Sequence, residues 1–242
     1  MSALADWLGG LGDDAVVGLD FPFGLPRFVV EATGNDSWRE FVRGFPASIG
    51  VDEENRAADP VRAFAERCVE LTDTHGEGTY DKRETDAVVG ARSPYGFIAD
   101  TIAFYGMRDV LGAVVDDVRV APIDAAPDGW RAAAPSGPVV AETYPAAILD
   151  RRGLCRTGYK GGGDDETARR TRNAEGLESQ SAVSYAADAA IRETAVGNAG
   201  GDAVDAVAAC VGAFDAARAG YATETDAFDD PEAIGVEGYI YA

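Results

Sequence analysis

Two acidic residues stand where predicted buried strands end. Asp20 follows the apolar run AVVGL at residues 15–19, and Glu142 closes the strand predicted over 138–142. In both segments a proline follows within three residues and turns the chain out of the sheet. Open α/β sheets bind ligands at the carboxyl ends of their strands, so the two carboxylates are expected to face one crevice. The alternative is that each side chain caps the turn that follows it.

A second pair of acids opens the helix predicted over 202–219. Asp202 and Asp205 are three residues apart and therefore lie on one side of that helix. The small residues that follow on the same flank are Ala209, Gly212 and Ala216. Such a flank lets a helix approach a sheet closely, which would bring both aspartates over the strand ends. The alternatives are an N-cap role for Asp202 and a helix-dipole role for Asp205.

Carboxylates from two strands and one helix predict a site for a hard, oxygen-preferring cation, Mg²⁺ or Mn²⁺. Two such ions about 4 Å apart can activate water and stabilise the leaving oxygen of a phosphodiester. The expected catalytic residues, which are also metal ligands, are Asp20, Glu142 and Asp205; Asp202 is a further metal ligand. The three cysteines are far apart and His75 is the single histidine. A zinc site or a Ser-His-Asp triad is therefore poorly supported.

The elements that must position these residues alternate between strands and helices. Apolar runs predict strands over 15–19, 118–123 and 138–142, and the tail GYIYA is expected to add a short edge strand. Helical spacing predicts helices over 3–11, 37–45, 56–74, 100–115, 145–153, 164–196 and 202–219. The segments 75–99 and 125–137 are expected to be loops. The pattern indicates an α/β domain.

The chain is strongly acidic. Asp and Glu number 42 against 21 Lys and Arg, which gives a net charge of −21, and only Lys82 and Lys160 are lysines. The acids are scattered along the chain, a pattern that keeps a protein dispersed in concentrated salt. We therefore predict a halophilic, archaeal source; the alternative is an acidic protein that binds cations or basic partners. At about 1 M salt the screening length falls to roughly 3 Å, so this charge does not exclude a nucleic-acid partner.

No stretch has the length of apolar residues that spans a bilayer, and the opening residues lack a signal segment. The sequence thus predicts a soluble, cytoplasmic protein without a membrane partner. It also contains no GxxxxGK[ST] loop.

Six short motifs occur in a characteristic order. They are GLDFPFGLP, ERC, RSPYGF, VVAETYPAA, GYK and GDAVDAVAA. In this order the chain resembles an uncharacterised family of predicted nucleases with a ribonuclease H-like fold, and the similarity runs from Asp20 to the closing EGYIYA. The resemblance implies one domain over residues 1–242, with a mixed central sheet, helices on both faces and a helical and loop insertion around 31–117. It also implies that Asp20, Glu142 and Asp205 bind metal.

The resemblance further implies that Arg67, Arg92 and Lys160 face a nucleic-acid substrate; the alternative for Arg67 is a surface ion pair. A ribonuclease H-like domain opens with three antiparallel strands, the first of which carries a metal-binding Asp. This chain instead opens with the predicted helix 3–11, so we expect an N-terminally truncated version, by a late-assigned start or by true loss. Loss of those strands favours the alternative of a non-catalytic module that binds nucleic acid, nucleotide or protein. An enzyme that transfers phosphate on a small nucleotide is a further alternative.

Overall fold

A small parallel sheet forms the centre of the computed structural model, which describes residues 2–35, 37–51, 59–75, 78–126, 129–181 and 189–242. Its strands are β1 (Val16–Leu19), β2 (Arg119–Ala121), β5 (Val139–Thr143) and β6 (Ile240–Tyr241). The order is β1-β5-β2, and β6 also pairs with β5. Every pair in this sheet is parallel, so the expected mixed sheet is corrected to a parallel one in the described part of the chain. The antiparallel pair is a separate hairpin, β3 (Ala125–Ala126) and β4 (Gly129–Trp130).

Two strands share one edge of β5. Glu142 pairs with Leu19 of β1 on one side and with Ile240 of β6 on the other. On the edge of β5 that pairs with β6, the earlier residues Val139–Ala141 pair with β2, which ends at Ala121. Pro122 follows there, and because proline has no backbone N–H it cannot continue the ladder. The predicted edge strand in the GYIYA tail is therefore confirmed as β6, which continues the edge that β2 leaves.

Helices make up most of the remaining structure. Before β2 they are α1 (Ser2–Gly9), α2 (Arg27–Ala32), α3 (Trp38–Gly44), η1 (Ala47–Ile49), α4 (Pro60–His75), α5 (Glu84–Val89), α6 (Ala99–Tyr105), the π-helix η2 (Gly106–Leu111) and α7 (Gly112–Val114). After β5 they are α8 (Pro145–Arg151), α9 (Asp164–Ser179), α10 (Ala189–Gly197), α11 (Asp202–Arg218), η3 (Pro231–Ala233) and α12 (Ile234–Glu237). Of the described helices, none combines the length and apolar character needed to cross a membrane.

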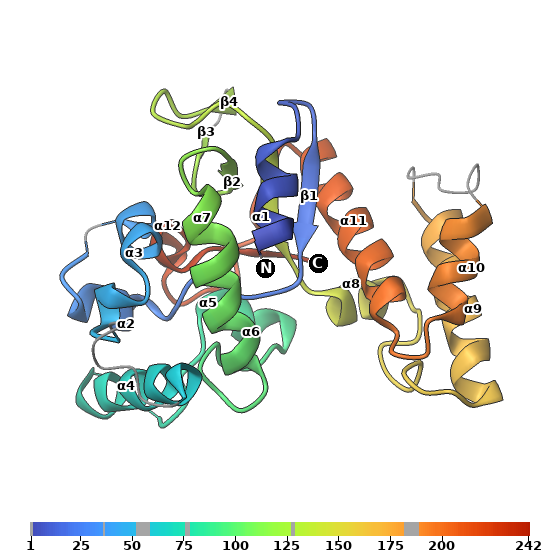
Figure 1. Ribbon diagram of the computed structural model, residues 1–242, viewed down its shortest axis with the longest axis horizontal. Helices are drawn as coiled ribbons and strands as arrows, with labels where there is room; N and C mark the ends of the chain where they lie inside the picture. The colour runs from blue at the N-terminus through green and yellow to red at the C-terminus, as the bar shows by residue number, and fades with distance from the viewer. Residues whose placement is uncertain (1, 36, 52–58, 76–77, 127–128, 182–188) are drawn as a thin grey trace.

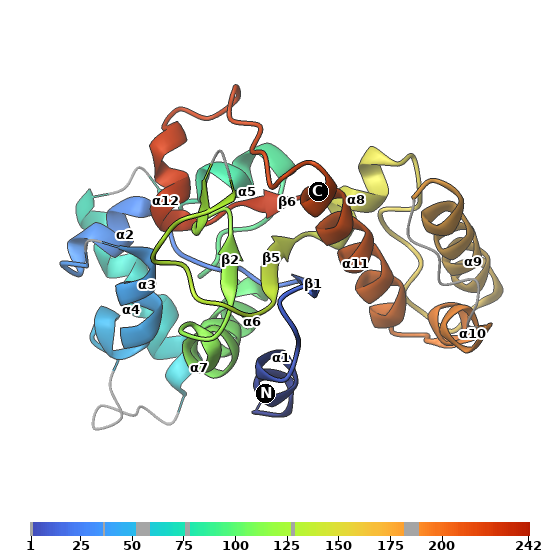
Figure 2. The same cartoon turned by 90° about the horizontal axis from the view of Figure 1, so that it is seen from above.

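The two faces of the sheet are covered by different parts of the chain. Successive residues of a strand point to opposite faces: Val140 packs into the core beneath α1, η2 and α7, whereas Val139 and Ala141 pack against α11 and the tyrosines near β6. Figure 1 shows α2, α3 and α4 at one end of the molecule and α9 and α10 at the other, with the sheet between them. Figure 2 shows α11 and α8 beside β1 and β5, on the side of the sheet away from α7. An α/β fold with helices on both faces is thus confirmed.

One predicted loop contains a helix. The segment 75–99 was expected to be irregular, but α5 spans Glu84–Val89. Its start is stabilised by the Asp86 carboxylate, which accepts a hydrogen bond from the backbone N–H of Arg83 at 3.1 Å. Its end is stabilised by Gly90, whose φ of 70° suits a residue without a Cβ. These local signals outweigh the polar composition of the segment.

Candidate functional site

A pocket of about 330 Å³ opens at the carboxyl end of the parallel sheet. Asp20, the residue directly after β1, lines it together with Glu142 and Thr143 from the end of β5. The two strands are neighbours, since Leu19 pairs with Glu142. Other lining residues come from segments far apart in the sequence, among them Arg92 and Lys160. This is the place where open α/β sheets bind ligands.

Asp20 is an exposed residue, with protein atoms crowded around its solvent-facing carboxylate. The partial desolvation that this causes, with the nearby Asp205 carboxylate, raises the pKa of Asp20 to about 7. Lys160 acts in the opposite direction and lowers the pKa, whereas Glu142 adds to the increase. Near neutral pH, Asp20 can therefore both accept and release a proton.

Asp205 is held by two groups from the loop before α9. The Tyr159 hydroxyl donates to Asp205 Oδ1 at 2.6 Å, and the Lys160 ammonium lies 2.7 Å from Asp205 Oδ2. Burial by itself would lower the pKa of Lys160, but its bond to Asp205 and the neighbouring carboxylates outweigh burial and raise it. The Asp205 side chain is 13 % exposed. Asp20, Asp205 and Lys160 are thus brought together as a cluster of two carboxylates with one cation.

The close approach of α11 to β1 brings Asp205 there. A Cβ at Gly18 would lie 2.3 Å from the backbone oxygen of Ala209, so only glycine allows this contact. Ala209, Gly212 and Ala216 are buried along the same flank. The predicted tight packing of a small-residue flank against the sheet is confirmed.

Asp202 differs from Asp205. Its side chain is 82 % exposed and its Oδ1 lies 3.7 Å from the Lys160 ammonium. The residue that caps α11 is Gly201, with φ of 80°, so the alternative that Asp202 is the N-cap is wrong. Asp202 lies at the solvent side of the Lys160 ammonium, and Asp205 lies at its inner side.

Glu142 is enclosed by protein partners. Its two carboxylate oxygens accept hydrogen bonds from Arg83 at 2.5 and 2.8 Å, and the backbone N–H of Phe23 donates to Oε2 at 3.0 Å. The same guanidinium also donates to both carboxylate oxygens of Asp86, at 2.8 and 2.9 Å. Arg83 and Glu142 are 0 % and 2 % exposed. Glu142 was expected to bind a metal ion, but in the structure its carboxylate pairs with the Arg83 guanidinium instead.

Sequence reasoning missed Arg83, which lies in the segment taken as a loop. The available signal is the pair Arg83 and Asp86, three residues apart at a helix start. It also missed Thr143. This residue is 2 % exposed and lines the pocket, and its hydroxyl has no hydrogen-bond partner in the described structure. A buried hydroxyl without a partner is costly, which makes Thr143 a candidate ligand-binding group.

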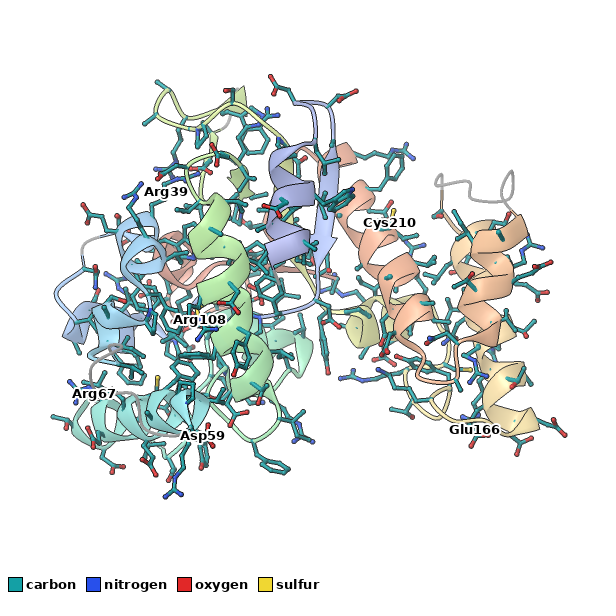
Figure 3. All side chains as sticks on the ribbon, viewed as in Figure 1. Arg39, Asp59, Arg67, Arg108, Glu166 and Cys210 are labelled. Atoms are coloured by element: carbon teal, nitrogen blue, oxygen red, sulfur yellow. The ribbon has the colours of Figure 1, made fainter. Side chains whose placement is uncertain are left out.

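The three predicted substrate-facing cations lie in different places. Lys160 and Arg92 line the pocket. Arg67 instead lies on α4, at the end of the molecule opposite to α9 (Figure 3). Its guanidinium donates to the Ile49 carbonyl at 3.2 Å and pairs with Glu70 at 3.0 Å. The structure therefore does not bring Arg67 to the pocket; it forms the surface ion pair that was the alternative.

Across the described ranges, no three His, Cys, Asp or Glu residues form a ready metal site. Both Glu142 oxygens are bound to Arg83, and both Asp205 oxygens are held by Tyr159 and Lys160. Asp20 is therefore the pocket carboxylate with no protein donor in the described structure. A divalent ion held there would be completed by water and substrate phosphate, because Mg²⁺ is commonly held by one or two carboxylates. The pKa of Asp20 is raised first by desolvation and then by the Asp205 carboxylate, and a cation bound beside Asp20 would lower it, as Lys160 already does in part.

Comparison of the chain with protein-family models, with curated proteins and with solved structures found no match.

Proposed function

We propose that this protein hydrolyses phosphodiester bonds in nucleic acid at the pocket that contains Asp20. The observation that carries the proposal is the placement of the exposed Asp20 carboxylate near Asp205 and Lys160 at the carboxyl ends of parallel strands, where desolvation and Asp205 raise its pKa to about 7. A group with such a pKa can act as a general base near neutral pH. Perturbed titration in a pocket is a feature of functional sites. The resemblance to predicted nucleases supplies the substrate class.

In this proposal Asp20 would hold one Mg²⁺ or Mn²⁺, which would supply Lewis-acid activation of a water and of a phosphate oxygen. The chain's own groups provide the remaining functions. Where no ion is bound to Asp20, its carboxylate can accept the proton of the attacking water. Tyr159 and Lys160 hold the Asp205 side chain in one orientation.

Three further groups of the pocket suit a phosphate. Lys160 and Arg92 carry positive charge, and Arg92 forms no ion pair within the described part of the chain. Thr143 adds a buried hydroxyl that has no hydrogen-bond partner in the described structure. Donors that converge on a phosphate stabilise the charge that develops on its oxygens. Two-metal catalysis that includes Glu142 is not part of the proposal, because both oxygens of this carboxylate bind Arg83.

A non-catalytic module is the second candidate, and the Glu142–Arg83 pair favours it. An internal cation in place of a metal ion is the arrangement expected where a site has been retained for binding alone. Such a module would bind nucleic acid, nucleotide or protein in the same pocket without cleavage.

The test is cleavage of end-labelled DNA and RNA, single-stranded and duplex, in molar KCl with Mg²⁺ or Mn²⁺. We expect Asp20→Asn to lower the rate by about a hundredfold or more, since general-base contributions are typically of that size. Asp13→Asn is the matched control, an exposed carboxylate near the other end of β1. Equal rates in wild type and Asp20→Asn would remove the hydrolase assignment, and binding without cleavage by the wild type would leave the module. Glu142→Gln is a poor probe here because it unpairs a buried arginine.

A further inference from the structure

Aromatic and aliphatic side chains are exposed beside the pocket. Phe97 is 79 % and Ile98 is 60 % exposed, and we call these two residues the 97–98 lip. Tyr80, nearby, is 54 % exposed. Exposed apolar groups that cluster at one place indicate a binding surface, whereas scattered ones need no explanation.

The backbone of the lip is strained. Ile98 has φ of 80° and ψ of −45°, close to the classic γ-turn, a conformation that is rare and unfavourable for a β-branched residue. Burial does not compensate for this cost, because the side chain is largely in solvent. Strain of this kind is found at ligand-binding positions, where it holds side chains ready for a partner.

Ile98 connects two hollows. It lines the pocket that contains Asp20, and it also lines a groove of about 970 Å³ along α4 and α6. Phe97, Tyr80 and Tyr105 contribute aromatic rings to the groove. Arg92, at the pocket, donates to the Phe97 carbonyl at 3.5 Å and so links the lip to the cationic side of the pocket. A chain-like ligand with its reacting bond at Asp20 would pass over Ile98 into this groove.

The charges of the two hollows differ. The pocket is lined by three bases (Arg83, Arg92 and Lys160) and three acids (Asp20, Asp86 and Glu142), whereas the groove is lined by four acids (Asp59, Glu66, Glu70 and Asp100) and one base (Arg62). The groove therefore disfavours phosphates and offers flat apolar surfaces. Nucleobases have such surfaces on both faces, and stacking on aromatic rings does not depend on sequence. It also contributes affinity in a protein whose net charge of −21 repels a phosphate backbone. In a duplex these base faces are covered by neighbouring pairs.

We propose that the 97–98 lip and Tyr80 form a stacking subsite for unpaired bases, so that the substrate is a single-stranded nucleic acid that lies with its phosphate in the pocket and its bases in the groove. This inference deepens the proposed function and rests on it for the position of the reacting phosphate. The subsite itself is testable by binding.

The experiment uses the full chain with the Asp20→Asn substitution, so that binding is measured without cleavage. Fluorescence anisotropy with a labelled single-stranded 12-mer, its duplex, and a basic apolar peptide is recorded at low and at molar KCl with Mg²⁺. Phe97→Ala is expected to weaken single-strand binding by roughly tenfold to a hundredfold, in line with alanine substitutions at stacked bases. Trp7→Ala is the matched control, because Trp7 is an aromatic residue 52 % exposed on α1, outside the pocket and the groove.

Phe97 is exposed, so its substitution should leave the melting temperature unchanged. Phe97→Leu should lose most of the affinity that the Phe97 ring contributes, because leucine cannot stack on a base. Equal affinity for the duplex, equal loss in Trp7→Ala, or Phe97-dependent binding of the peptide alone would overturn the subsite. Wild-type cleavage without an effect of Phe97→Ala on affinity or rate would overturn the subsite and leave the hydrolase. Phe97-dependent binding of the single strand without cleavage by the wild type would support the subsite and overturn the hydrolase. Absence of both binding and cleavage would overturn both proposals.

Discussion

Lys160 is the cation on which two carboxylates depend. It lies 2.7 Å from Asp205 and lowers the pKa of Asp20, which desolvation and Asp205 raise to about 7. A single ammonium shared in this way leaves the cluster with net negative charge. The cluster is therefore sensitive both to pH near neutrality and to added cations.

Replacement of Lys160 by Met is expected to raise the pKa of Asp20 above its value of about 7, because the favourable charge is lost while Asp205 remains. The pH at which Asp20 ionises then moves upward, and activity that needs its carboxylate form appears at higher pH. NMR titration of the carboxyl carbon without divalent ions measures the shift directly. Arg92→Met is the control, since Arg92 also lines the pocket but is not among the groups that set this pKa. An unchanged or lowered pKa in Lys160→Met contradicts the prediction.

Thr143→Val should separate binding from stability. The Thr143 hydroxyl is buried without a partner, and valine has the same shape without the polar atom, so we expect the unfolding free energy to stay constant or to rise by about 1 kcal/mol. If the hydroxyl contacts substrate, the rate falls in this more stable variant. Chemical denaturation and the cleavage assay provide the two measurements, with Thr143→Ser as the variant that retains the hydroxyl. A variant that loses stability would show that the hydroxyl has a partner in the folded protein.

At the scale of elements, α9 fixes the loop that carries Lys160. Arg170 of α9 is 2 % exposed and donates to the carbonyls of Tyr159, Gly161 and Val196, each at 2.7 Å. These bonds join α9, the end of α10 and the loop before α9. Arg170 is thus a positioning residue, and its effect on the pocket passes through Lys160.

Arg170→Met is expected to destabilise the protein by roughly 2–4 kcal/mol, because one buried and two partly buried carbonyls lose a charged donor. It should also weaken the hold of Lys160 on Asp205 and raise the pKa of Asp20, as Lys160→Met does. Arg169→Met is the control one residue away; its guanidinium belongs to an exposed residue and, among the described residues, donates one hydrogen bond, to the Thr157 carbonyl at 3.5 Å. Denaturation together with the Asp20 titration tests the prediction. A destabilised variant with an unshifted Asp20 would show that Arg170 serves folding alone.

The elements themselves were largely predictable from local pattern. Apolar runs located β1, β2 and β5, and helical spacing located α1, α3 and α11, because each pattern repeats over several residues. The parallel pairing of the sheet was not predictable, since it depends on how segments a hundred residues apart meet. Helix α5 was missed because its signals are a single cap at each end. Part of the helix predicted over 56–74 and part of that over 164–196 lie outside the described residues.

Part of the candidate site was also predictable from the sequence. Asp20 and Asp205 were found from strand ends and helix spacing, and Lys160 from a motif, and these three do meet. That Glu142 would bind Arg83 was not visible, because the two residues are 59 positions apart and nothing local marks Arg83 as buried. A carboxylate at the end of a buried strand requires a cation or hydrogen-bond donors nearby. Only the folded structure shows which group fills that role.

At the scale of the whole molecule, the net charge of −21 governs the response to salt. We expect the melting temperature to rise as KCl increases from 0.1 to 2 M, because the screening length falls from about 10 Å to under 3 Å and the mutual repulsion of surface acids declines. Calorimetry at several concentrations measures this, with sucrose of equal osmolarity as the control for effects that do not depend on charge. A melting temperature that is flat or falls with KCl would argue against adaptation to salt.

The contact between Gly18 and the Ala209 carbonyl has a consequence for the titration of Asp20. Asp20 is two residues beyond the first member of this contact, and Asp205 is one helical turn before the second. The backbones that carry the two carboxylates are therefore held close together by the approach of α11 to β1. To move them apart would require a shift of the 17-residue helix against the sheet. Packing in the apolar interior thus helps to set how strongly Asp205 raises the pKa of Asp20.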